Sequence, residues 1–104
     1  VARVAVEPDG ARTRELLESF NFATLTLVGA LQRDGVRWGL VDDGTGGIHR
    51  VRVGNYLGKN HGRIVAASEN RLDVVEIVPD GKGGWIETPR TLELRETTAQ
   101  VAGE

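Results

Sequence analysis

Few residues in this chain have the type and spacing that nucleophilic catalysis requires. A nucleophile needs a hydroxyl, thiol or amine beside a positioned base, but the chain has no cysteine and only two serines, Ser19 and Ser68. Neither serine lies in the strained Gly-x-Ser-x-Gly turn that exposes a catalytic serine. His49 alternates with valines and His61 lies in a glycine-flanked loop, so we interpret both as structural. The sequence predicts a protein that is not an enzyme.

The acidic and glycine-rich segments also lack the patterns of metal and phosphate sites. Asp42 and Asp43 match no recognised ligand spacing with the histidines, and segment 42–47 lacks the calcium-loop pattern with its terminal glutamate. The glycines of segment 81–84 are followed by neither a helix nor the Lys-Ser/Thr pair of a phosphate loop. We therefore predict no metal and no cofactor.

One carboxylate is unusual, because Glu76 shares a strand face with Leu72, Val74 and Val78. Either that face is solvated at Glu76, or Glu76 pairs with an arginine across the sheet. We favour the pair as a structural feature, because general acid–base catalysis usually needs a second group beside a lone carboxylate.

The elements that carry these residues follow from the alternation of apolar and polar side chains, which is typical of strands. The pattern predicts an all-β chain that forms a small β-sandwich of about seven short antiparallel strands. The expected strands are 25–31, 36–40, 48–53, 63–68, 72–78, 85–88 and 91–95. Pro89 is expected to separate the last two strands. Asp34-Gly35 predicts a tight hairpin turn, because both residues tolerate positive φ angles.

The 104 residues, 39% of them hydrophobic, suit one domain with a modest core. We predict a flexible N-terminal tether over 1–11, a β-sandwich domain over 12–96 and a polar C-terminal tail over 97–104. No apolar run approaches the ~20 residues of a membrane-spanning helix. Because the chain begins with valine, we expect a piece of a longer protein.

A short N-terminal helical turn is expected within segment 12–20. Leu16, Leu17 and Phe20 would share one face of this turn, and Thr13 would cap it. So short a helix is marginal alone and would need to lie across the open end of the sheets.

Positive charge is concentrated in the middle of the chain, although the net charge is −2. Residues 44–68 contain Arg50, Arg52, Lys59 and Arg63 and no acidic residue, whereas the segments on either side are net acidic. This basic block could steer an acidic partner. The alternative is a solvated surface whose acidic neighbours come from adjacent strands.

Binding of single-stranded nucleic acid by a small β-barrel is the alternative function. Such barrels stack bases on exposed aromatic side chains beside basic loops. Trp38 alternates with Val36 and Leu40 and is expected in the core, so only Tyr56 lies near the basic block. The negative net charge also disfavours this function. A third interpretation is a structural spacer domain without a specific partner.

Three segments resemble the PilP family of type IV pilus proteins. Residues 25–31, Leu-Thr-Leu-Val-Gly-Ala-Leu, resemble the family's first strand, x-M-V-G-T-L. Residues 49–64 resemble its central V-G-x-Y-L-G-x-N-x-G-R-I signature, and residues 75–81, followed by 84–87, are similar to its E-I-V-P-D-G-x-G-x-W-x-E segment. The resemblance covers roughly residues 14–96. The chain departs from it at Leu27, Ala30 and His61, where the family commonly has Met, Thr and Asn.

The resemblance implies a non-enzymatic docking module of the type IV pilus assembly machine. The family consists of inner-membrane lipoproteins whose folded part is a periplasmic β-sandwich similar to the homology region of the type II secretion protein GspC. The resemblance further implies that the folded domain contacts the N-terminal periplasmic domain of the outer-membrane secretin PilQ. The N-terminal region would associate with the PilN–PilO heterodimer. We therefore expect a periplasmic location and a tether to the inner membrane in the full-length protein.

Two surfaces are expected to bind the partner. One is the first strand with its hairpin, 24–37, because an exposed edge strand can pair with the backbone of a partner. The other is the basic block. The expected contact residues are Thr24, Thr26, Val28, Arg33, Arg37, Arg50, Arg52, Lys59 and Arg63.

Overall fold

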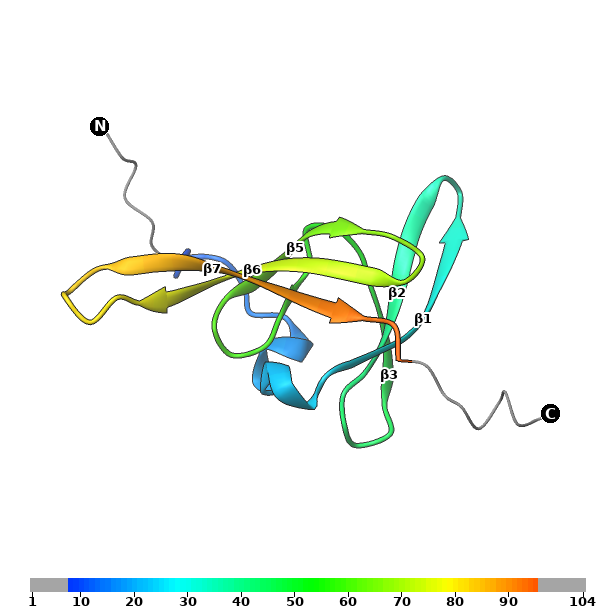
Figure 1. Cartoon of the computed structure of the whole chain (residues 1–104), viewed down its shortest axis with the longest axis horizontal. Helices are drawn as coiled ribbons and strands as arrows, with labels where there is room; N and C mark the ends of the chain where they lie inside the picture. Colours follow the sequence, from blue (N-terminus) through cyan, green and yellow to red (C-terminus); the bar gives the residue numbers. More distant parts are fainter. Residues whose placement is uncertain (1–7, 96–104) are drawn as a thin grey trace.

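Two antiparallel sheets make up the computed structural model, which describes residues 8–95 (Figure 1). The first sheet has the strand order β1-β2-β3, and the second has the order β4-β5-β6-β7. The strands are β1 Thr26–Arg33, β2 Val36–Asp42, β3 Ile48–Val51, β4 Tyr56–Leu57, β5 Gly62–Ala67, β6 Arg71–Pro79 and β7 Trp85–Glu93. Two 3-10 turns, η1 Leu16–Ser19 and η2 Phe22–Thr24, precede them. The predicted all-β fold with a short N-terminal helical turn is confirmed.

The core lies between the two sheets and consists of leucine, isoleucine and valine side chains. Its buried members are Leu17, Leu25, Leu27, Val41, Val51, Leu57, Ile64, Leu72, Val74 and Leu92. Each such side chain contributes roughly 1.5–3 kcal/mol when it leaves water. A Cβ atom at Gly39 would lie 3.2 Å from both methyl groups of Leu72. Glycine at this position therefore lets β2 approach the second sheet.

Tight turns join the strands of the first sheet. Asp34 and Gly35 connect β1 to β2 with φ angles of 53° and 79°, which confirms the predicted hairpin and matches the twist of its strands. In the loop from Asp42 to Gly47, the backbone N–H of Asp43 donates to the carbonyl of Gly47 over 3.0 Å. This loop places β3 beside β2.

The predicted strand bounds were wrong around Pro89 and in the loop 54–62. One strand, β7, runs through Pro89, because β7 lies at a sheet edge, where a missing N–H removes no bond to the neighbouring strand. A strand of two residues, β4, lies inside the segment that the sequence predicted to be a loop. In addition, β3 ends at Val51 and leaves Val53 half exposed.

The predicted turn in segment 12–20 is shorter than expected and has another cap. Only Leu16–Ser19 is helical, and Glu15 is the N-cap, while Glu18 accepts a hydrogen bond from the backbone N–H of Glu15. Leu16 is 66% exposed, so it does not share a buried face with Leu17. The reason is that the polar side chains of this segment bond to one another and to β4, which a continued helix would prevent.

Both predicted terminal segments fall largely outside the described residues. Residues 1–7 belong to the expected tether, and residues 96–104 include the expected tail. The division into tether, domain and tail therefore stays a prediction. Between residues 8 and 95, no helix has the length and apolar character needed to cross a membrane.

Candidate functional site

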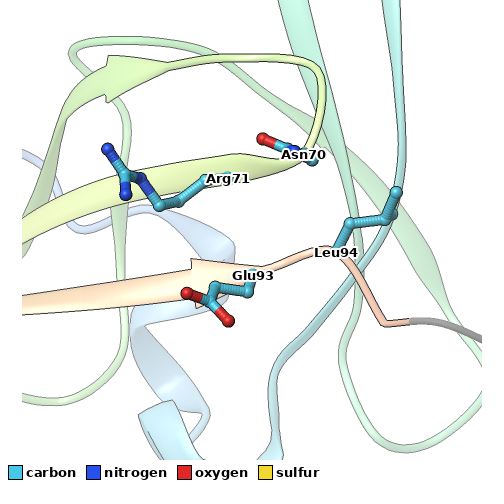
Figure 2. A pocket seen from close by; sticks show the side chains of 4 residues that line it. All are labelled: Asn70, Arg71, Glu93 and Leu94. Atoms are coloured by element: carbon cyan, nitrogen blue, oxygen red, sulfur yellow. The ribbon is translucent and has the colours of Figure 1, made fainter.

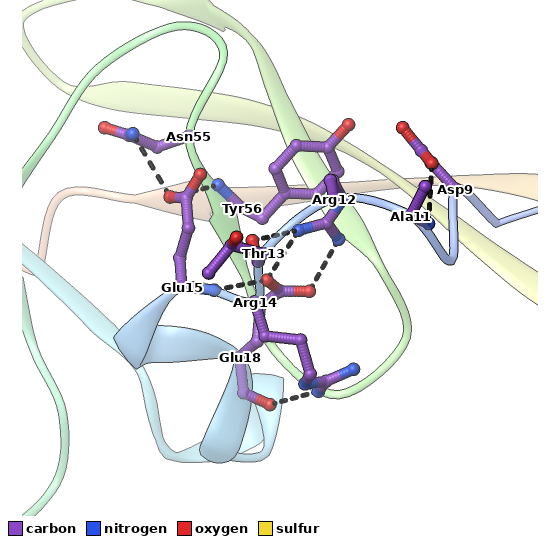
Figure 3. A network of polar contacts seen from close by, with 9 residues as sticks. All are labelled: Asp9, Ala11, Arg12, Thr13, Arg14, Glu15, Glu18, Asn55 and Tyr56. Carbon is purple, nitrogen blue, oxygen red and sulfur yellow. Dashed lines mark hydrogen bonds and ion pairs between the residues drawn. The ribbon is translucent and has the colours of Figure 1, made fainter.

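The segment 9–18, called the strap below, is joined to β4 by its side chains (Figure 3). Arg12 donates two hydrogen bonds to the Glu18 carboxylate, at 2.8 and 2.7 Å. The same guanidinium lies over the Tyr56 ring, 3.3 Å from its centre. The Glu15 carboxylate accepts a hydrogen bond from the Tyr56 backbone N–H at 3.0 Å and another from the Asn55 side chain at 3.2 Å. The strap thus covers the outer edge of β4.

In the ion pair of the strap, Arg12 and Glu18 each stabilise the charged form of the other. The hydrogen bonds from Arg12 lower the pKa of Glu18, although burial alone would raise it. The hydrogen bond to Glu18 raises the pKa of Arg12 in turn. Glu18 is fully buried, and both of its carboxylate oxygens are bonded. This arrangement indicates that the pair has a structural role.

Buried Asp43, in the loop before β3, and partly buried His49, on β3, form a second pair. The Asp43 carboxylate accepts hydrogen bonds from the hydroxyl and backbone N–H of Thr45, at 2.6 and 2.8 Å. It also lies 2.7 Å from Nε2 of His49. The Thr45 hydroxyl, and then His49, hold the pKa of Asp43 well below its usual range. These bonds order the loop and the start of β3.

Glu76 pairs with an arginine across the sheet, as the sequence predicted. Arg90 of β7 donates to Glu76 of β6 over 3.1 Å, and its guanidinium lies 4.3 Å from the centre of the Phe22 ring. Glu76 is 1% exposed. These three pairs lie at separate places, and a fourth ion pair, between Arg71 and Asp73, is more exposed. No group of three metal-ligating side chains occurs within residues 8–95.

The face of the first sheet that points away from the core carries arginines around an aromatic ring. Leu31 lies opposite Trp38, and Leu40 lies opposite Arg50, so these side chains share that face. The guanidiniums of Arg50 and Arg52 lie 5.4 and 5.0 Å from the centre of the Trp38 ring. We call the following residues the outer face: Leu31, Arg33, Val36, Trp38, Leu40, Ile48, Arg50 and Arg52.

The position of Trp38 corrects the expectation that it belongs to the core. Trp38 is only partly buried, because its β2 neighbours Gly39 and Val41 take the core side and alternate residues of a strand point to opposite faces. Alternation in β2 alone fits either assignment, since both sets of residues are largely apolar. The register between β2 and β3, which places Leu40 opposite Arg50, would have revealed the outer face.

The structure divides the basic block between two surfaces. Arg52 lines a hollow of about 410 Å³ together with Arg37. The guanidiniums of Arg50 and Arg52 both lie beside the Trp38 ring. Arg63 lies on β5 and lines another hollow, of about 350 Å³, with Arg12, Tyr56 and Glu87. Lys59 is exposed in the turn between β4 and β5.

Several arginines on and beside the first sheet have no carboxylate partner among the described residues 8–95. The ion pairs found between residues 8 and 95 involve none of Arg33, Arg37, Arg50 and Arg52. Contacts of arginine with an aromatic ring are worth about 0.5–1 kcal/mol at exposed sites. The guanidiniums of Arg50 and Arg52 therefore remain available to an anionic group.

The predicted edge of β1 is partly occupied. Thr24 is exposed in η2, Thr26 lies opposite Asp42, and Val28 lies in a bulge between β1 and β2. Leu27 bridges to Leu94, and the N–H of residue 95 donates to the Leu27 carbonyl over 2.9 Å.

A hollow of about 520 Å³ opens near this junction, lined by Asn70, Arg71, Glu93 and Leu94 (Figure 2). Arg71 and Glu93 lie opposite each other on β6 and β7. Leu94 approaches Asn70, since its N–H donates to the Asn70 carbonyl over 2.7 Å. The end of β7 therefore connects the two sheets.

Comparison with known proteins gives one consistent family. Residues 2–94 match the family model described as "Pilus assembly protein, PilP". The chain is 50% identical over 91 residues to the type IV pilus inner membrane component PilP of Pseudomonas aeruginosa. That match covers 88% of this chain and 52% of the relative, so the chain spans about half the length of the curated relative.

Solved structures agree with this similarity. A domain from the type IV pilus biogenesis lipoprotein PilP of Pseudomonas aeruginosa superposes with a TM-score of 0.78 and 51% identity, covering 85% of this chain and 100% of that one. A domain from the Neisseria meningitidis PilP pilot protein superposes with a TM-score of 0.68 and 30% identity, covering 93% of this chain and 85% of that one.

Proposed function

Because the chain belongs to the PilP family of pilus assembly proteins, we propose that it is a non-enzymatic docking module in the periplasm. In this proposal it links the inner-membrane PilN–PilO platform to the outer-membrane secretin PilQ. The folded domain binds the N-terminal periplasmic domain of the secretin. The N-terminal region, most of which precedes the described residues, associates with PilN–PilO and carries the tether to the inner membrane.

The observation that carries this proposal is the outer face of the first sheet. Between residues 8 and 95, no strand or turn pairs beyond β3, and Ile48 is 53% exposed. Trp38 and its two arginines combine apolar area with positive charge, and aromatic and arginine side chains are enriched in protein interfaces. This face is suited to bind another protein.

The proposal assigns docking to one part of the predicted contact set. Arg33, Arg50 and Arg52 belong to the outer face, and Arg37 shares a hollow with Arg52. Arg63 lies on β5 of the second sheet and Lys59 lies in the turn before β5, whereas Trp38 belongs to the first sheet. The secretin domain therefore contacts the first group, and the second group serves as an internal control.

The test is a titration of the isotope-labelled domain with the N-terminal domain of PilQ. Binding should shift the amide resonances of β2 and β3 and the indole N–H of Trp38. Arg50→Glu with Arg52→Glu should weaken binding at least about tenfold, because two attractive charges become repulsive. Lys59→Glu with Arg63→Glu, which changes the net charge equally, should leave the affinity within about twofold. No shift at high micromolar concentration would contradict the proposal.

A second candidate function, binding of single-stranded nucleic acid, is favoured by one observation. Trp38 lies beside Arg50 and Arg52, and aromatic rings with neighbouring arginines can stack bases. A gel-shift assay at low salt separates the two functions. Retardation of single-stranded DNA or RNA that disappears as salt is added would support this candidate.

A further inference from the structure

The four edge strands of the two sheets differ in how their open sides are protected. The edges are β1 and β3 in the first sheet, and β4 and β7 in the second. An unprotected edge presents free N–H and C=O groups that another strand can pair with. Folded proteins normally cover, shorten or interrupt such edges, so an uncovered edge is informative.

Three of these edges are covered or interrupted. The strap covers β4, because the N–H of Tyr56 donates to Glu15 and the N–H of Gly58 donates to the Leu17 carbonyl, both over 3.0 Å. The end of the described chain covers part of β1, through the bond from residue 95 to Leu27. Pro89 removes a donor from the middle of β7.

The edge of β3 differs from these three in its hydrogen bonding, although Glu15, Leu16 and Leu17 of the strap flank it across a hollow of about 120 Å³ that His49, Arg50 and Val51 also line. Within residues 8–95, no backbone group of Ile48, His49, Arg50 or Val51 forms a hydrogen bond outside its pairing with β2. In an antiparallel strand, alternate residues turn both backbone groups toward the same side. Half of the β3 residues therefore present an N–H and a C=O to the open side.

The edge of β3 is also held in one conformation before any partner strand binds. His49 is fixed by Asp43, which in turn accepts hydrogen bonds from Thr45 and Gly47. A strand that adds here does not have to order β3 first, and a smaller loss of conformational entropy favours binding. The short length of β3 limits the number of backbone bonds, so side-chain contacts must supply the rest of the affinity.

The side chains beside this edge are cationic. Arg50 lies on β3 and Arg52 follows it, both on the outer face, and neither has a carboxylate partner between residues 8 and 95. On an added strand, side chains two residues apart point to the same face and lie about 5 Å from their cross-strand neighbours. Carboxylates at alternate positions would therefore meet both arginines.

We propose that the open edge of β3 accepts an extended acidic segment of another protein as a fourth strand of the first sheet. Backbone hydrogen bonds to β3 hold the segment, and its alternate carboxylates pair with Arg50 and Arg52. This inference rests on the proposed docking function, because it names the chemistry of the segment that binds beside the same face.

The experiment uses a blocked peptide of about seven residues that alternates threonine and glutamate, which is long enough to span β3. Titrated into the isotope-labelled domain, it should shift the amides of β3 and the indole N–H of Trp38. The matching threonine–glutamine peptide should bind at least about tenfold more weakly, because it lacks the charge. A threonine–glutamate peptide methylated on alternate backbone nitrogens should produce no shift in β3, because it keeps the charge but cannot pair along the edge.

Each alternative result overturns the inference. Equal binding of the methylated peptide would show attraction by charge alone, and shifts confined to β1 or β7 would place the added strand at another edge. If the variant with Arg50→Glu and Arg52→Glu still binds the peptide, the two arginines are not part of the binding site. No shift at millimolar peptide would also overturn it, since a site that prefers this chemistry must respond at that concentration.

The peptide and the secretin domain separate this inference from the proposed function. If the secretin domain binds and the peptides do not, docking stands and strand addition at β3 is wrong. If the glutamate peptide binds at β3 and the secretin domain does not bind, strand addition stands and the secretin is not the partner.

Discussion

Arg12 lies over the ring of Tyr56, with its guanidinium carbon 3.3 Å from the ring centre. Arg12 comes from the strap, and Tyr56 belongs to the segment that matches the family's central signature. The same guanidinium bonds both oxygens of the buried Glu18 carboxylate. One side chain therefore connects the N-terminal side of the domain to β4.

Replacing Arg12 should destabilise the domain. Arg12→Ala leaves the buried carboxylate of Glu18 without its cation, which typically costs about 3 kcal/mol in free energy of unfolding. Arg14→Ala is the control, because Arg14 donates only to the backbone carbonyl of Glu18, over 3.1 Å, and should cost at most about 1 kcal/mol. Urea unfolding followed by tryptophan fluorescence measures both. Equal losses would show that the ion pair is not the cause.

Stability should decrease in acid. The pKa values of Glu18 and Asp43 are lowered in the folded protein from ordinary values of 4.5 and 3.8. The unfolded chain therefore binds protons first as the pH falls below these values, and the free energy of unfolding falls with it. Above pH ~5 both contributions are fully present. Thermal unfolding between pH 7 and pH 3 tests this, and Asp43→Asn should show a shallower decrease than the unaltered chain.

An added methyl group at Gly39 should push the sheets apart. A Cβ atom there would lie 3.2 Å from the Leu72 methyl groups and 3.3 Å from Leu27, and overpacking of this kind typically costs about 1–3 kcal/mol. Gly10→Ala is the matched control, since no atom lies within 4 Å of its added Cβ. Urea unfolding compares the two, and the prediction is wrong if Gly39→Ala unfolds at the same urea concentration as the unaltered chain.

Pro89 should limit self-association along β7. Pro89→Val restores a donor to the exposed edge of a nine-residue strand, so sedimentation velocity should detect concentration-dependent dimers. Thr91→Val, in the same strand and also exposed, replaces a hydroxyl with a methyl group without adding a backbone donor and should leave the protein monomeric. Dimers of both variants would point to surface hydrophobicity as the cause, and dimers of neither would refute a protective role of Pro89.

The proposed binding to the secretin domain should weaken as salt is added. Raising the ionic strength from about 50 to about 500 mM shortens the screening length severalfold, so the dissociation constant should rise roughly three- to tenfold. The variant with Arg50→Glu and Arg52→Glu should lose this dependence. Isothermal titration calorimetry measures both, and a dissociation constant that does not change with salt would exclude charge from the interface.

The sequence alone was sufficient for the fold class and for several local features. Alternating side chains predicted the strands, and Asp34-Gly35 predicted the first hairpin, because turn chemistry and strand periodicity depend on neighbouring residues only. The pairing of Glu76 was also predicted, since a carboxylate among apolar residues must find a cation when it is buried. Its partner, Arg90, depended on the register between β6 and β7.

The tertiary structure decided which surfaces are open. The side of β2 that carries Trp38, the covering of β4 by the strap and the separation of Arg63 from Arg50 all depend on contacts between residues far apart in the chain. A strand with apolar residues on both sides can bury either one, and only packing against the other sheet makes the choice. Local sequence determines extended backbone and turns, whereas the free energy of burying one face over the other is a property of the assembled domain.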